Sequence, residues 1–122
     1  MKQLIFISYD LGLHGDYVNL YKWLDTHDAK ECGDSFCCLT YEFKTVSQVS
    51  SDEETRNMLK EIHDDIKASD NLSGRDRFYI VSELYYKGQK KMMGTFIFGK
   101  RLQKNPWDGA SNKEIYSQDI DE

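Results

Sequence analysis

The alternation of strand-like and helix-like segments constrains the fold of this chain more than any other feature. Residues 4–9 form a short, nearly continuous apolar run with β-branched members. Such a run predicts a central strand covered on both faces. Residues 17–24 follow with apolar positions at the helical period, and Asp16 precedes them as a capping residue. The N-terminal part is therefore expected to be a strand followed by an amphipathic helix.

Residues 29–43 carry the densest strand signal in the chain. Gly33-Asp34 is expected to form a two-residue turn, because glycine readily adopts the positive φ that a tight hairpin needs. A short strand over residues 30–32 would then pair with a longer strand over residues 35–43. Side chains alternate between the faces of a strand, so one face of the second strand is the predicted core face. Its members are Cys37, Leu39, Tyr41 and Phe43.

A second helix and two further strands are predicted in the C-terminal half. Ser51 and Glu54 have the spacing of a capping box, in which each side chain bonds a backbone amide near the other residue. Residues 77–84 and 92–98 read as strands, joined by a turn at Lys87-Gly88. The apolar face of the helix is formed by Thr55, Met58, Leu59, Ile62 and Ile66.

The predicted order of elements is βαββαβ with one added C-terminal strand. Helices that share one face of an antiparallel sheet define an α+β class, and this order indicates a ferredoxin-like sheet. The chain has 122 residues, which suits a single domain. We assign residues 1–104 to that domain and expect residues 105–122 to be a polar, acidic and partly disordered tail.

Composition predicts a cytoplasmic protein that does not enter a membrane. The longest apolar run, Leu4–Ile7, is far too short for a membrane span or a signal-peptide core. The three cysteines lack the paired spacing of a zinc site, and adjacent Cys37 and Cys38 would point to opposite faces of a strand. Reduced, partly buried thiols are therefore expected.

The charges are distributed unevenly along the chain. The formal net charge is −5, which alone argues against general affinity for nucleic acid. Residues 84–107, however, contain no acidic residue and six of the 16 basic ones. Lys100, Arg101 and Lys104 follow the last predicted strand and are the better candidates for contacts with a nucleic-acid backbone. The lysines near Lys87 have an alternative interpretation, protection of an edge hairpin against aggregation.

Three short motifs resemble the small CRISPR-associated nuclease family of the spacer-integration complex (the second Cas protein) and its SinR-like relatives. The first strand ends in Tyr9-Asp10 and is followed by a loop and a helix. Ser35-Phe36 lies at the hairpin where that family has a Ser-Val-Phe or Ser-Thr-Trp element. A helix, an acidic loop and the strand beginning at Arg77 complete the match.

This resemblance implies a homodimer in which two copies of Asp10 meet across a two-fold axis and hold a divalent cation such as Mg²⁺. The metal would polarise a phosphate and activate water for phosphodiester hydrolysis. Asp10 is then both the catalytic and the metal-binding position, and Ser35 and Phe36 have a positioning role. Without the resemblance, Asp10 would simply cap nearby amides.

Three functions follow from these observations. The first is a dimeric, metal-dependent nuclease-like protein. The second is a non-catalytic dimer that binds nucleic acid or a protein through its basic C-terminal third. The third is a regulatory interaction module of the antitoxin or inhibitor type that uses its acidic helices.

Overall fold

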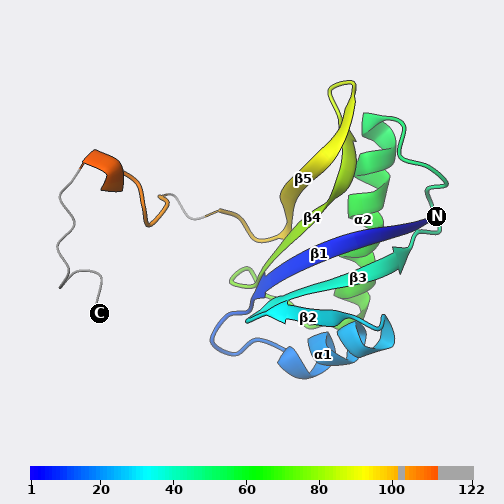
Figure 1. Cartoon of the computed structure of the whole chain (residues 1–122). Helices are drawn as coiled ribbons and strands as arrows, with labels where there is room; N and C mark the ends of the chain where they lie inside the picture. Colours follow the sequence, from blue (N-terminus) through cyan, green and yellow to red (C-terminus); the bar gives the residue numbers. More distant parts are fainter. Residues whose placement is uncertain (102–103, 113–122) are drawn as a thin grey trace.

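Strands and helices alternate in the predicted order in the computed structural model, which describes residues 1–101 and 104–112 (Figure 1). Most of the predicted acidic tail, residues 113–122, lies outside the described residues. The elements are β1 (Lys2–Asp10), α1 (Tyr17–Thr26), β2 (Lys30–Gly33), β3 (Phe36–Glu42), α2 (Asp52–Ser69), β4 (Arg77–Tyr86), β5 (Gln89–Phe98) and the short 3₁₀ helix η1 (Ala110–Asn112).

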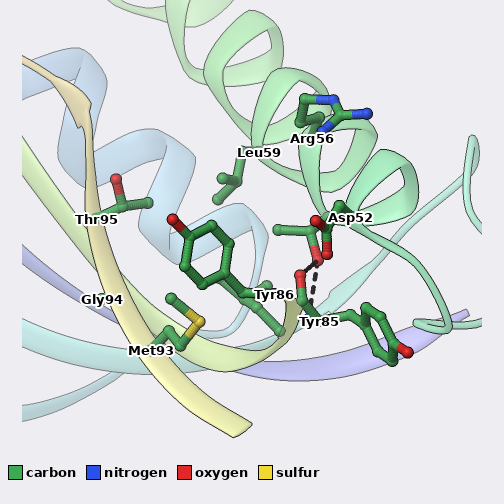
Figure 2. A pocket seen from close by; sticks show the side chains of 10 residues that line it. Asp52, Arg56, Leu59, Tyr85, Tyr86, Met93, Gly94 and Thr95 are labelled. Atoms are coloured by element: carbon green, nitrogen blue, oxygen red, sulfur yellow. Dashed lines mark hydrogen bonds between the residues drawn. The ribbon is translucent and has the colours of Figure 1, made fainter. Parts of the chain in front are cut away.

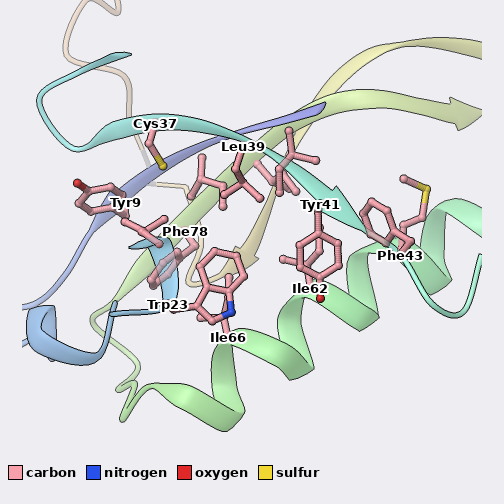
Figure 3. Close-up of a cluster of buried hydrophobic side chains, with 14 of the residues drawn as sticks. Tyr9, Trp23, Cys37, Leu39, Tyr41, Phe43, Ile62, Ile66 and Phe78 are labelled. Atoms are coloured by element: carbon pink, nitrogen blue, oxygen red, sulfur yellow. The ribbon is translucent and has the colours of Figure 1, made fainter. Parts of the chain in front are cut away.

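The strands form one five-stranded sheet in the order β2-β3-β1-β4-β5, and every neighbouring pair is antiparallel. Strand β1 lies in the centre, where Ile7 is opposite Cys37 of β3 and Ile80 of β4. Both helices pack on the same face of the sheet (Figure 1, Figure 3). The chain is therefore a mixed α/β structure with two helices over an antiparallel sheet.

The hydrophobic core lies between the sheet and the two helices (Figure 3). Ile5 and Ile7 of β1 are fully buried, as is Ile66 of α2. Burial of one such aliphatic side chain contributes about 1.5–3 kcal/mol. The predicted core face of β3 is confirmed, since these four residues are all buried: Cys37, Leu39, Tyr41 and Phe43.

The prediction that the first strand is covered on both faces is wrong. Leu4 is 51% exposed and Phe6 is only half-buried, because no element in the described part of the chain covers their side of the sheet. The run reads as continuous because apolar residues also occupy this second, open face of β1.

Side chains cap both helices at their predicted first turns. Asp16 accepts a hydrogen bond from the amide of Asn19, and Ser51 accepts one from the amide of Glu54. The carboxylate of Glu54 bonds the amide and hydroxyl of Ser50 instead of reaching back to Ser51. Neither helix in the described residues has the length and apolar character required to cross a membrane.

One hairpin turn differs from its prediction by a residue. Gly33 pairs with Phe36, so Asp34 and Ser35 form the loop, and Ser35 takes the positive φ of 56°. A short polar residue tolerates this conformation, which leaves glycine unnecessary there. The turn at Lys87-Gly88 is confirmed, and both of its residues have positive φ.

A β-bulge interrupts the pairing of β4 with β5. Tyr79 is opposite Phe96, whereas the preceding residue Phe78 is opposite Phe98, so Ile97 is the extra residue. Phe98 therefore lies on the helix-covered face, where it contacts the rings of Phe78 and His63. Phe96 lies on the open face with Tyr79.

Candidate functional site

The end of the sheet at Asp10 carries an exposed ion pair. Asp10 ends β1, Arg77 begins β4, and the two residues are directly opposite each other. The guanidinium of Arg77 donates to the carboxylate of Asp10. The Asp10 side chain is 64% exposed and that of Arg77 is 30% exposed, so both are accessible to a ligand.

A shallow depression of about 320 Å³ lies beside this ion pair on the open face of the sheet. Ser8 contributes a hydroxyl, and Tyr79 contributes both a hydroxyl and an aromatic ring. Phe96 completes the wall, with its ring centre 4.9 Å from that of Tyr79. A guanidinium, hydroxyls and aromatic faces in one depression suit a ligand that has both an anionic group and a planar ring.

Ser35 and Phe36, the predicted positioning residues, lie at the same end of the sheet. The carbonyl of Ser35 accepts a 3.0 Å hydrogen bond from the amide of Tyr9. Phe36 is opposite Ser8 and stacks on Phe6, with ring centres 5.9 Å apart. Their contacts fix the backbone at the end of β1 and add a second aromatic pair to the open face.

Two of the three predicted basic residues leave the sheet beside Arg77. Gly99 follows β5 with a positive φ of 74°, and a Cβ added there would lie 2.6 Å from Cγ of Arg77. The exposed residues Lys100 and Arg101 come next in the chain. Lys104 is also exposed, but residues 102–103 lie outside the described part, so its position relative to the site is not defined.

Arg77 is one of the site residues that sequence reasoning missed, together with Ser8, Tyr79 and Phe96. The strand pattern marks Arg77 only as the first residue of a strand. The charged residue Asp76 directly before it was the available signal that this end of the strand carries charged side chains. Asp76 is 1% exposed and accepts hydrogen bonds of 2.7 Å from the amides of Gly12 and Ser73. This carboxylate joins the loop after β1 to the loop before β4, which holds Asp10 and Arg77 in register.

A second carboxylate, that of Asp70, is buried near these loops. Asp70 is 6% exposed, and within residues 1–101 and 104–112 neither of its oxygens has a hydrogen-bond partner. Burial, followed by the nearby charges of Asp16 and Asp76, raises the pKa of Asp70 to about 6. Asp16, by contrast, has a lowered pKa because Asn19 and the amide of Asn71 donate to it.

Asp65 joins α1, α2 and β3 away from the Asp10 end. Its carboxylate accepts hydrogen bonds from the hydroxyl of Tyr41 at 2.8 Å and from the indole of Trp23 at 3.2 Å. Nε2 of His27 lies 3.5 Å from the same oxygen. Burial and the bond to Asp65 raise the pKa of the Tyr41 phenol. Because each buried donor has an acceptor, this cluster stabilises the packing of the two helices.

A larger cavity of about 480 Å³ lies between the first turns of α2 and the β4–β5 hairpin (Figure 2). Leu59 and Met93 form parts of its apolar lining. The hydroxyl of Thr55 donates to the carbonyl of Tyr85 and accepts from its amide, which ties the helix to the strand beside the cavity. Its lining also includes the guanidinium of Arg56 and the aromatic residues Tyr85 and Tyr86, and the carboxylate of Asp52 lies in the same lining.

No family model matches this chain, and no curated protein or solved structure shows significant similarity to it.

Proposed function

We propose that this chain binds nucleic acid at the Asp10 end of its sheet. The observation that carries the proposal is the position of Arg77 in a depression with aromatic walls, with Gly99 packed against it. The basic residues Lys100 and Arg101 follow Gly99 directly in the chain. Basic residues neutralise backbone phosphates, and this neutralisation supplies most of the sequence-independent affinity for nucleic acid.

The ion pair tunes the strength of this interaction. A guanidinium has five donors, so Arg77 can bond a phosphate while retaining a bond to Asp10. The carboxylate of Asp10 nevertheless repels the phosphate and occupies some of the guanidinium donors of Arg77. Binding is therefore expected to be moderate and strongly dependent on salt.

A mobility-shift titration at several salt concentrations tests the proposal. Arg77→Gln and the double substitution Lys100→Gln/Arg101→Gln should each weaken binding and lower the salt slope, by about 0.7–0.9 for each phosphate that is no longer neutralised. Lys67→Gln, which removes an exposed charge from α2, is the matched control. Failure of the wild-type protein to bind at low salt, or equal weakening in all three variants, would contradict the proposal.

Metal-dependent phosphodiester hydrolysis is a second candidate, favoured by the exposure of Asp10 at the end of β1. Within residues 1–101 and 104–112, no group of three or more His, Cys, Asp or Glu side chains is arranged to hold a metal ion. Mg²⁺ retains several waters and needs few protein ligands, so Asp10 from each subunit of a homodimer would suffice. Asp10→Asn should abolish Mg²⁺-dependent cleavage while binding is retained. Cleavage that survives Asp10→Asn, or sedimentation as a monomer, excludes this candidate.

We also propose that the sheet and its two helices form a ferredoxin-like unit. Strands β2-β3-β1-β4, with both helices on one face, support a ferredoxin-like unit to which β5 adds an edge. Such a unit leaves the opposite face of its sheet open, and this is the face on which the depression lies. A cytoplasmic location would bring the protein together with nucleic acid.

A further inference from the structure

Four aromatic side chains lie on the open face of the sheet, each on a different strand. Phe36 of β3 is opposite Ser8 of β1, Ser8 is opposite Tyr79 of β4, and Tyr79 is opposite Phe96 of β5. Phe6 lies next to this row and stacks on Phe36. The row therefore crosses four adjacent strands, a width of roughly 14 Å at the usual spacing between strands.

The structure keeps this row accessible. Each of the four aromatic residues is only partly buried, and no element of the described residues lies over them. Gly94 contributes to this arrangement, because any Cβ at that position would collide with the ring of Tyr79. The absence of a side chain at Gly94 therefore leaves room for the ring of Tyr79 against β5.

The aromatic row is continuous with the cationic end of the sheet. Tyr79 and Phe96 line the same depression as Arg77, and Lys100 and Arg101 follow from the end of β5. A strand of nucleic acid whose phosphates contact these cations would have its bases directed over the aromatic rings. Base–aromatic stacking is tolerant of sequence, since every base has a π-face.

We infer that the open face stacks the unpaired bases of a single-stranded nucleic acid whose backbone is held at Arg77, Lys100 and Arg101. The inference rests on the proposed function and specifies its ligand. A duplex hides its base faces, so it can use only the cationic end. Two or three bases suit a sheet face of this kind.

The alternative occupant of the open face is a second copy of the chain. Leu4 and Met92, which are 51% and 57% exposed, would be covered in such a pair. Continuity with the cationic end favours nucleic acid, because its phosphates would neutralise these cations while its bases cover the aromatic rings. The experiment must nevertheless distinguish the two occupants.

Fluorescence anisotropy with a labelled mixed-sequence 12-mer tests the inference in two ways. The wild-type protein should bind the single strand at least tenfold more tightly than a duplex of the same sequence. Tyr79→Leu and Phe96→Leu should each weaken single-strand binding roughly five- to hundredfold and leave duplex binding almost unchanged. Tyr21→Leu, which removes a 53% exposed tyrosine from α1, is the matched control.

The outcomes separate this inference from the proposed function. Equal affinity for single strand and duplex, with both abolished in Arg77→Gln, overturns base stacking and leaves the phosphate interaction standing. Absence of binding to either form overturns both. A dimer that dissociates on Phe96→Leu, in sedimentation runs without nucleic acid, assigns the open face to a second copy and overturns stacking. The single-strand preference is measured on the wild-type protein, so it holds even if one variant does not fold.

Discussion

Arg77 lies directly across the sheet from Asp10, and the charged groups of the two residues form an ion pair although they are 67 positions apart in sequence. The carboxylate and the guanidinium of the candidate site are therefore bonded to each other. A change in either residue alters the environment of the other.

Substitution of the two partners should change nucleic-acid binding in opposite directions. Asp10→Asn removes a repulsive charge and frees the guanidinium, so affinity should rise severalfold, whereas Arg77→Gln should lower it. Because Asp10 is largely exposed, removal of the pair should change the free energy of unfolding by less than about 1 kcal/mol. Anisotropy titrations and urea unfolding of both variants check this. Weaker binding in both variants would show that the intact pair, rather than the free cation, is recognised.

Asp70→Asn should stabilise the protein at neutral pH. The folded-state pKa of Asp70 is raised to about 6, so the folded protein binds this proton more tightly than the unfolded chain does. The free energy of unfolding of the wild type should therefore rise as the pH falls through 6. At pH 7.5 the uncharged amide should add on the order of 1–3 kcal/mol, and this gain should shrink towards pH 4.5.

Urea unfolding of the wild type and Asp70→Asn at both pH values measures this difference. Asp34→Asn, in the exposed β2–β3 turn, is the control for removal of a surface carboxylate. A gain at pH 7.5 that persists unchanged at pH 4.5 would show that the orphaned carboxylate is not its cause.

Asp65→Ala should destabilise the packing of α1 against α2 and β3. The buried indole of Trp23 and the buried hydroxyl of Tyr41 would lose their acceptor, at a cost of roughly 1–3 kcal/mol. Asp64→Ala, one residue earlier on the exposed surface, should change stability by less than about 0.5 kcal/mol. Thermal unfolding followed by circular dichroism compares the two, and equal destabilisation would contradict a specific role for Asp65.

Two of the three thiols, those of Cys32 and Cys37, should react in a defined order. Cys32 is exposed, whereas burial raises the pKa of Cys37 to about 11. The thiolate is the reactive form, so at pH 8 Cys37 should be labelled about 100-fold more slowly than an ordinary thiol. Timed alkylation followed by peptide mass spectrometry measures the order. Labelling of Cys37 as fast as that of Cys32 would mean that β3 opens readily from the core.

The elements and the core face were predictable because their signals are local. A cap such as Asp16 or Ser51 acts within one turn of its helix, and the alternation along β3 needs only one strand. Asp10, Ser35 and Phe36, which the short motifs single out, lie together at one end of the sheet. The basic segment that begins at Lys100 leaves β5 near that same end.

The ion pair between Asp10 and Arg77 was not predictable from local sequence patterns. Arg77 meets Asp10 only through the register of β1 with β4, which depends on contacts distant in sequence. The open face was missed for a related reason, since Leu4 and Phe6 are as apolar as the buried residues beside them. Burial of Asp70 depends on the contact between the loop after β1 and the loop before β4. No spacing in the sequence indicates that contact.

The extra residue in β5 places two phenylalanines, which regular alternation would direct to one side, on opposite sides of the sheet. If the strand alternated regularly through Ile97, the ring of Phe98 would lie on the open face beside Phe96 instead of in the core. One extra amino acid thus allows Phe98 to fill the interior while Phe96, two positions earlier, stays on the outer surface of the sheet.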